Sequence, residues 1–205
     1  MQETVIGTSF TKALLGGIAL AFIASAAGAI AVDVEPDRFP VGTDLRTAFP
    51  GVVLSVVGEP DTEIRSLTGF STFLGRNVAT TGTRVFGQFP GPGPIAPPFE
   101  LDNSITWSAL HGNLRADFSA LADRVRIDLI FDDDDVGFLN AYDSSGNLLE
   151  SVIASGDGRG PVPFVTAEIS RPDFDIAYII AGGFASEGGP LDDLQVRMVP
   201  EPASA

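Results

Sequence analysis

The sequence predicts an all-β domain built as a two-sheet antiparallel sandwich. Glycine (23 residues) and proline (15 residues) are spread along the 205-residue chain as breaks between short segments. These segments are either continuously apolar or alternate between apolar and polar residues, which is typical of strands. Beyond residue 31, no segment has the apolar spacing of a long helix. Short strands separated by turns in this way favour two packed antiparallel sheets.

The first expected strands lie in the N-terminal half of the domain. Residues 51–58 form a short apolar run between two glycines, as in a buried strand. Residues 84–89 and 114–118 are the next expected strands. Between them, residues 90–98 contain five prolines, which cannot donate hydrogen bonds to a sheet. We interpret this stretch as a long loop within one domain.

Residues 124–131 show the clearest alternation. Their apolar side chains fall on one face of an extended chain: Val125, Ile127, Leu129 and Phe131. Their polar side chains fall on the other face: Arg124, Arg126 and Asp128. A hairpin follows, in which residues 138–142 and 148–153 flank a glycine-containing turn. The remaining expected strands are 162–169, 174–181 and 191–199.

The N-terminal residues 13–31 have the pattern of an export signal. An apolar stretch follows Lys12 and ends in small residues with the A-x-A form that a signal peptidase reads. We predict cleavage after Ala31, with cleavage after Ala29 as the alternative, so that the sandwich domain is residues 32–199. A transmembrane anchor is the competing interpretation, because the stretch has about the length of a membrane span. The acidic chain that follows favours cleavage.

Charge and cysteine content limit the classes of partner. The formal net charge is −15, and the domain after residue 31 has 11 arginines, no lysine and 26 acidic residues. Such a charge argues against nucleic acid and anionic membrane surfaces as partners. The chain has no cysteine, so an exported form is stabilised by packing and not by disulfides.

Catalytic patterns are absent from the sequence. His111 is the only histidine and the chain has no cysteine, so cysteine–histidine nucleophilic pairs and zinc sites built from histidine and cysteine are not available. A glycosidase needs two carboxylates across a cleft, but with this many acidic residues no particular pair stands out. We therefore expect a protein that is not an enzyme.

Two acidic segments are candidates for calcium, which takes oxygen ligands. The first is the run of residues 132–135, in which Asp132 and Asp134 can face one ion. The second is the pair Asp192 and Asp193 at the start of the last expected strand. The alternatives are a solvated turn and a plain strand edge. No cofactor other than calcium is expected.

Four segments resemble the PEP-CTERM group of exported bacterial proteins. The chain ends in Val-Pro-Glu-Pro-Ala-Ser-Ala, which contains the sorting motif Pro200, Glu201 and Pro202. Residues 37–45 followed by 49–55 resemble the opening segment of these proteins, residues 139–149 their central hairpin, and residues 191–196 their last strand. The family's tag continues into a transmembrane helix and an arginine-rich end, and neither follows Pro202 here. Either the sequence is truncated at this point or this member lacks the retention segment. On this pattern we expect the chain as given to be released and not anchored.

The resemblance implies a fold, a location and two processing partners. Domains of this group are similar to jelly-roll, galactose-binding-like sandwiches. The implied setting is the envelope or extracellular polysaccharide matrix of a Gram-negative bacterium. Signal peptidase is an implied partner, and so is an exosortase-type sorting enzyme where the full tag exists.

These expectations combine into a noncatalytic surface or matrix protein. A carbohydrate-binding module of the polysaccharide matrix is the alternative, and a hydrolase is a weaker one. Sugar-binding modules use exposed aromatic rings as platforms, and Trp107, the single tryptophan, is the candidate platform. The sequence names no ligand.

Overall fold

The chain folds into a mostly antiparallel all-β structure. The computed structural model describes residues 28–71, 76–90, 107, 112–131, 135–156, 164–184 and 189–199. Every strand pairing within these ranges is antiparallel. The elements in chain order are β1 (Ile30–Val34), the short 3-10 helix η1 (Pro36–Arg38), β2 (Val52–Val56), β3 (Thr62–Thr68), β4 (Phe70–Ser71), β5 (Arg76–Asn77), β6 (Arg84–Pro90), β7 (Leu114–Ile130), β8 (Val136–Tyr142), β9 (Leu148–Ser155), β10 (Phe164–Ser170), β11 (Ile176–Gly183) and β12 (Leu191–Met198).

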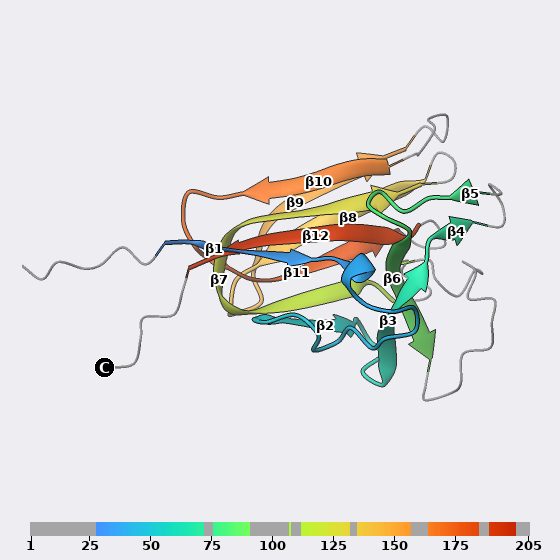
Figure 1. The fold of residues 1–205 in the computed structure, drawn as a ribbon. Helices are drawn as coiled ribbons and strands as arrows, with labels where there is room; N and C mark the ends of the chain where they lie inside the picture. Colours follow the sequence, from blue (N-terminus) through green and yellow to red (C-terminus); the bar gives the residue numbers. More distant parts are fainter. Residues whose placement is uncertain are drawn as a thin grey trace, which may run out of the picture.

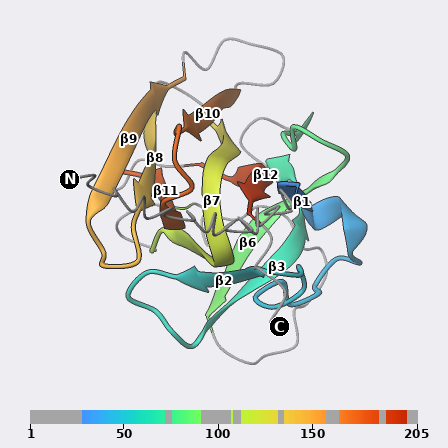
Figure 2. The ribbon, with the colours of Figure 1, turned by 90° about the vertical axis from the view of Figure 1, so that its left-hand side faces the viewer.

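The long strand β7 pairs with four other described strands, β2, β10, β11 and β12. It lies near the centre of Figure 2. Residues 114–118 of β7 pair with β2 and β11, and β11 pairs in turn with the hairpin β8–β9. Residues 124–130 of β7 pair with β10, and this half of the strand also pairs with β12. The two halves therefore belong to two groups of strands, which is consistent with a sandwich.

The sequence pattern predicts two separate strands at 114–118 and 124–131, and the structure corrects this. One strand of 17 residues covers both segments. The alternation of apolar residues is interrupted between them because β7 passes there from one group of strands to the other.

The core lies beneath the alternating half of β7. Val125 and Ile127 are fully buried, and Leu129 and Phe131 are nearly so, which confirms the apolar face predicted for this segment. Burying each such side chain contributes about 1.5–3 kcal/mol. The polar face is less uniform than predicted, because Asp128 is also buried.

The other predicted strands are largely confirmed. The β8–β9 hairpin pairs Tyr142 with Leu148 around the predicted turn, where Gly146 adopts a positive φ of 83°. The strands predicted at 51–58, 84–89, 162–169, 174–181 and 191–199 correspond to β2, β6, β10, β11 and β12. Strands β1, β3, β4 and β5 were not predicted individually.

The ends of the fold lie next to each other. Strand β1 pairs with β12, with Ile30 opposite Met198. The start of β1 and the end of β12 therefore lie together, on the left in Figure 1. The predicted domain boundary after Ala31 falls inside β1, whereas a boundary after Ala29 leaves the strand whole. The core of the predicted export signal lies outside the described residues. Within the described ranges, no helix is long and apolar enough to cross a membrane.

Candidate functional site

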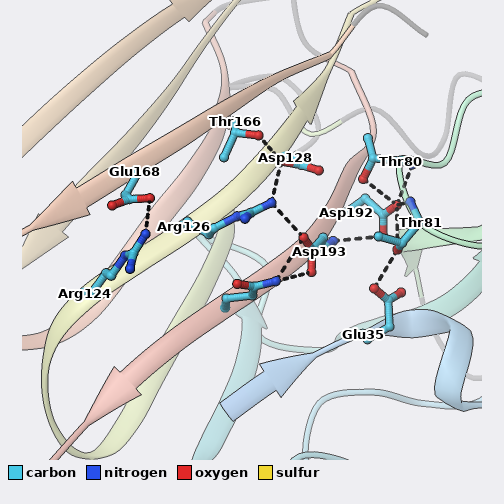
Figure 3. Close-up of polar contacts among 11 residues, drawn as sticks. Glu35, Thr80, Thr81, Arg124, Arg126, Asp128, Thr166, Glu168, Asp192 and Asp193 are labelled. Carbon is cyan, nitrogen blue, oxygen red and sulfur yellow. Dashed lines mark hydrogen bonds and ion pairs between the residues drawn. The ribbon is translucent and has the colours of Figure 1, made fainter. Parts of the chain in front are cut away.

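A cluster of buried and half-buried polar side chains surrounds the start of β12 (Figure 3). Its centre is Asp192, which has no solvent exposure. The Oδ2 atom of Asp192 accepts the backbone N–H of Thr80 at 2.8 Å, the Thr80 hydroxyl at 3.0 Å and the backbone N–H of Thr81 at 3.1 Å. The Oδ1 atom accepts the N–H of Asp193 at 2.9 Å. This carboxylate therefore fastens the turn before β6 to β12.

A second carboxylate reaches the same turn. Glu35, which precedes η1, accepts the Thr81 hydroxyl through Oε2 at 2.6 Å. Burial raises the pKa of Asp192 to about 7; the Thr81 N–H opposes this rise and the negative charge of Glu35 adds to it. Burial likewise raises the pKa of Glu35. Asp192 therefore keeps its proton up to a higher pH than an exposed aspartate does, and the pKa of Glu35 is shifted in the same direction.

The next residue, Asp193, faces a different set of partners. It has a φ of 45°, in the left-handed region that residues other than glycine seldom adopt, and it lies at a break in the β7–β12 register. Its Oδ2 accepts Arg126 Nη2 at 3.1 Å, and its carboxylate also accepts the Gln195 amide at 3.1 and 3.2 Å. The break in register thus directs Asp193 towards Arg126 (Figure 3) and towards Gln195.

The buried Asp128 extends this cluster to β10. Its Oδ1 accepts the Thr166 hydroxyl at 2.6 Å and lies 3.8 Å from Arg126 Nη2. The Nε atom of Arg126 is buried without a hydrogen-bond partner among the described residues. Arg126 is therefore held between two carboxylates while one of its donors is unsatisfied.

The predicted calcium ligands divide into two groups. Asp192 and Asp193 lie in the cluster, but their carboxylates bind separate sets of protein donors. Asp132 and Asp134 lie outside the described residues, so the acidic run stays a prediction. Within the described ranges, no group of three or more acidic or histidine side chains could hold a metal ion.

Trp107 is not the exposed platform that the sequence analysis proposed. The ring is fully buried, and its Nε1–H donates to the Phe86 carbonyl at 2.8 Å. Its backbone carbonyl accepts the N–H of Gly183 at 2.6 Å. A buried ring presents no face to a sugar, so Trp107 acts as a core anchor between β6 and β11.

The two tyrosines cover one another on a different part of the sheet. Tyr142 and Tyr178 stack with ring centroids 4.8 Å apart and an angle of 6° between the planes. The Arg115 guanidinium lies 3.8 Å from the Tyr178 ring centroid, and Asp117 binds this arginine. Because Tyr178 lies between a ring and a guanidinium, it is not an open platform.

An open groove lies beside the cluster, over β1, β12 and the second half of β7. It has a volume of about 310 Å³, and its polar lining is formed by Asp33, Arg124, Arg126, Gln195 and Arg197. Asp193 connects the two sites, since it binds both Arg126 and Gln195.

The sequence places Arg124 and Arg126 on the polar face of a strand but does not reveal this groove. Alternation could place both residues on one face. It could not show that β12 would bring Arg197 opposite Arg124. Likewise, no local pattern connects Glu35 and Thr81 with Asp192.

The comparisons with known proteins add no family to this description. No protein-family model matches the chain, and no curated protein matches it.

Proposed function

We propose that this chain is an exported, noncatalytic β-sandwich protein of the cell surface or extracellular matrix. The proposal assigns it to the PEP-CTERM group and gives it a jelly-roll, galactose-binding-like architecture. Its support in the sequence is the export signal at residues 13–31 together with Pro200, Glu201 and Pro202 near the C-terminus.

The structural observation that supports this proposal is the engagement of the buried carboxylates. Asp192 and Asp193 accept hydrogen bonds as described above, and Asp128 binds Thr166. Asp123 accepts Arg197 Nε and Nη2 at 2.7 and 2.6 Å. A hydrolytic carboxyl group must exchange a proton or form a bond with substrate, whereas these four groups fasten strands and turns together.

Export is tested by expressing the full chain in a Gram-negative host. The full chain is expected outside the cytoplasm in a shortened form, and N-terminal sequencing identifies the cleavage site. A matched variant lacking residues 13–31 is expected to stay inside the cell. Equal distribution of the two chains would contradict export. A screen with glycosidase and esterase substrates tests the noncatalytic assignment, and turnover above that of a heat-denatured sample would contradict it.

The second candidate function is a carbohydrate-binding module of the polysaccharide matrix. The specific observation in its favour is the polar groove over β1, β12 and β7, which has a volume near the lower end of small-ligand sites, about 300–1,000 Å³. Since Trp107 is buried and Tyr178 is covered, aromatic stacking does not support this candidate. Hydrogen bonding and charge in the groove do.

A further inference from the structure

Two arginines face each other across neighbouring strands in the groove. Arg124 of β7 and Arg197 of β12 are directly opposite in the antiparallel register. Directly opposed like charges destabilise a sheet. The pKa of Arg124 is raised overall, mainly by the hydrogen bond with Glu168. The positive charge of Arg197 offsets part of that rise. The strand register therefore keeps two positively charged side chains next to each other on the surface of an acidic protein.

A third arginine extends the pair into a cluster. Arg126 lies two residues along β7, so its side chain leaves the strand on the same side as Arg124 (Figure 3). Three of the chain's 12 basic residues thus line one groove. The left-handed Asp193 holds Arg126 and the neighbouring Gln195 in place.

The protein's own carboxylates bind these arginines incompletely. Arg124 donates to Glu168 only through Nη2, at 2.8 Å, and Arg197 donates to Asp123 through Nε and Nη2. Arg126 donates through Nη2 to Asp193. Each guanidinium has five N–H donors, so donors without a hydrogen bond to any described residue remain on all three arginines.

The carboxylates that neutralise these arginines also limit which kind of ligand the groove can bind. Because Glu168 and Asp123 offset the arginine charges, long-range attraction of any polyanion is weak. Recognition must come from short, directional hydrogen bonds. A ligand carboxylate matches the planar fork of a guanidinium, and ligand hydroxyl groups match the Gln195 amide and the Asp33 carboxylate, which also line the groove.

We propose that this groove binds the carboxylate of a uronic-acid unit in an acidic saccharide, with Arg124 and Arg197 sharing the carboxylate and Gln195 contacting the sugar hydroxyls. This inference rests on the carbohydrate-binding alternative of the proposed function. The ligand carboxylate accepts charge-assisted hydrogen bonds from the two guanidinium groups, which gives it an advantage over a neutral sugar of the same size.

The test uses a galacturonate oligomer and its methyl ester, which differ in charge and hardly in size. Binding of each to the exported protein is measured by titration calorimetry. The acid is expected to bind at least about tenfold more tightly than the ester, because charge-assisted hydrogen bonds to arginine are lost on esterification. Added salt is expected to change the binding of the acid only slightly, because the contacts are short and long-range attraction is weak.

Three variants test whether the saccharide binds in this groove. Arg124→Gln and Arg197→Gln are each expected to weaken binding of the acid at least about tenfold. Arg115→Gln is the matched control, because Arg115 is also a partly exposed arginine paired with a carboxylate but lies outside the groove. It is expected to leave binding unchanged. Thermal melting of each variant shows whether the fold is retained.

Three outcomes would overturn the inference. Equal binding of acid and ester would reject carboxylate recognition but leave carbohydrate binding standing. Binding that survives both groove substitutions in folded proteins would reject the location. No binding of either oligomer would reject the inference, while the export assay would still decide the surface-protein proposal independently.

Discussion

The Asp192 carboxylate and the Thr80 backbone N–H are 2.8 Å apart, although 112 positions separate the two residues in the sequence. Because Asp192 is completely buried, this contact and its neighbours satisfy polar groups that water cannot reach. The contact joins the last strand to the turn before β6. The stability of that junction depends on the protonation state of one carboxyl group.

We predict that the domain loses stability as the pH rises from about 4 to about 7. The pKa of Asp192 is raised from 3.8 to about 7, so the folded chain holds a proton that the unfolded chain releases at lower pH. The free energy of unfolding therefore falls between about pH 4 and pH 7 and is lowest above that window. Glu35 acts in the same direction because its pKa is also raised. The fall is at most on the order of 4 kcal/mol, at about 1.4 kcal/mol per pKa unit.

Urea unfolding of the wild type and of Asp192→Asn at several pH values measures this effect. The amide cannot ionise, so the variant is expected to show a shallower dependence on pH. Asp192→Ala is expected to be less stable at every pH, because it leaves the Thr80 and Thr81 N–H groups unsatisfied at about 1–3 kcal/mol each. A wild-type stability that rises steadily from pH 5 to pH 8 would contradict the prediction.

Gly82 is predicted to be intolerant of a side chain. It has a φ of +50°, and an added β carbon would lie 2.3 Å from Cγ of Asp37. Asp37 also accepts the N–H of Thr83 at 3.0 Å, so moving it breaks a second contact. Gly82→Ala is expected to cost more than the roughly 1–2 kcal/mol of left-handed strain alone.

Gly58→Ala is the control for that substitution. Gly58 has a φ of +82° but no atom within 4 Å of the added carbon. The loss of stability in Gly58→Ala therefore measures the cost of backbone strain without a steric clash. Denaturant midpoints of the two variants give the difference, and equal losses would show that the Asp37 contact does not limit this position.

Leu129 is predicted to be the more costly of two leucines on the same strand. It is 2% exposed, whereas Leu121 is 44% exposed. Leu129→Ala is expected to cost about 2–5 kcal/mol because it leaves a cavity in the core. Leu121→Ala is expected to change stability by less than about 0.5 kcal/mol. Urea unfolding followed by circular dichroism measures both, and similar losses would argue against the observed orientation of β7.

The start of β1 predicts which export cleavage leaves the better-folded domain. A chain that begins at Ile30 retains the pairing of Ile30 with Met198 and of Ala31 with Arg197. A chain that begins at Val32 loses both pairs, and each lost backbone hydrogen bond costs about 1 kcal/mol. Melting of the two purified chains measures the difference. N-terminal sequencing of the exported protein shows which start is used, Val32 for the predicted cleavage after Ala31 or Ile30 for the alternative. Equal stability of the two purified chains would contradict the prediction.

Local patterns in the sequence were enough to place most strands. The alternation of residues 124–131 predicted the core face of β7, and the glycine turn near residue 146 predicted the β8–β9 hairpin. Both features depend on neighbouring residues, because a strand alternates with a period of two and a tight turn needs particular residue types. The same patterns could not show that β7 is one continuous strand, because its two halves present their apolar residues to different partners.

The tertiary structure alone decided the sites. The sequence identified Asp192 as a candidate carboxylate ligand. Its burial against Thr80 depends on a contact between segments that are distant in the sequence. Trp107 was visible as an aromatic residue, but only packing showed that its ring lies in the core. Arg124 and Arg197 became neighbours through strand register. Burial and register are set by how all the strands pack together, so the sequence determined which side chains were available and the fold determined which of them meet.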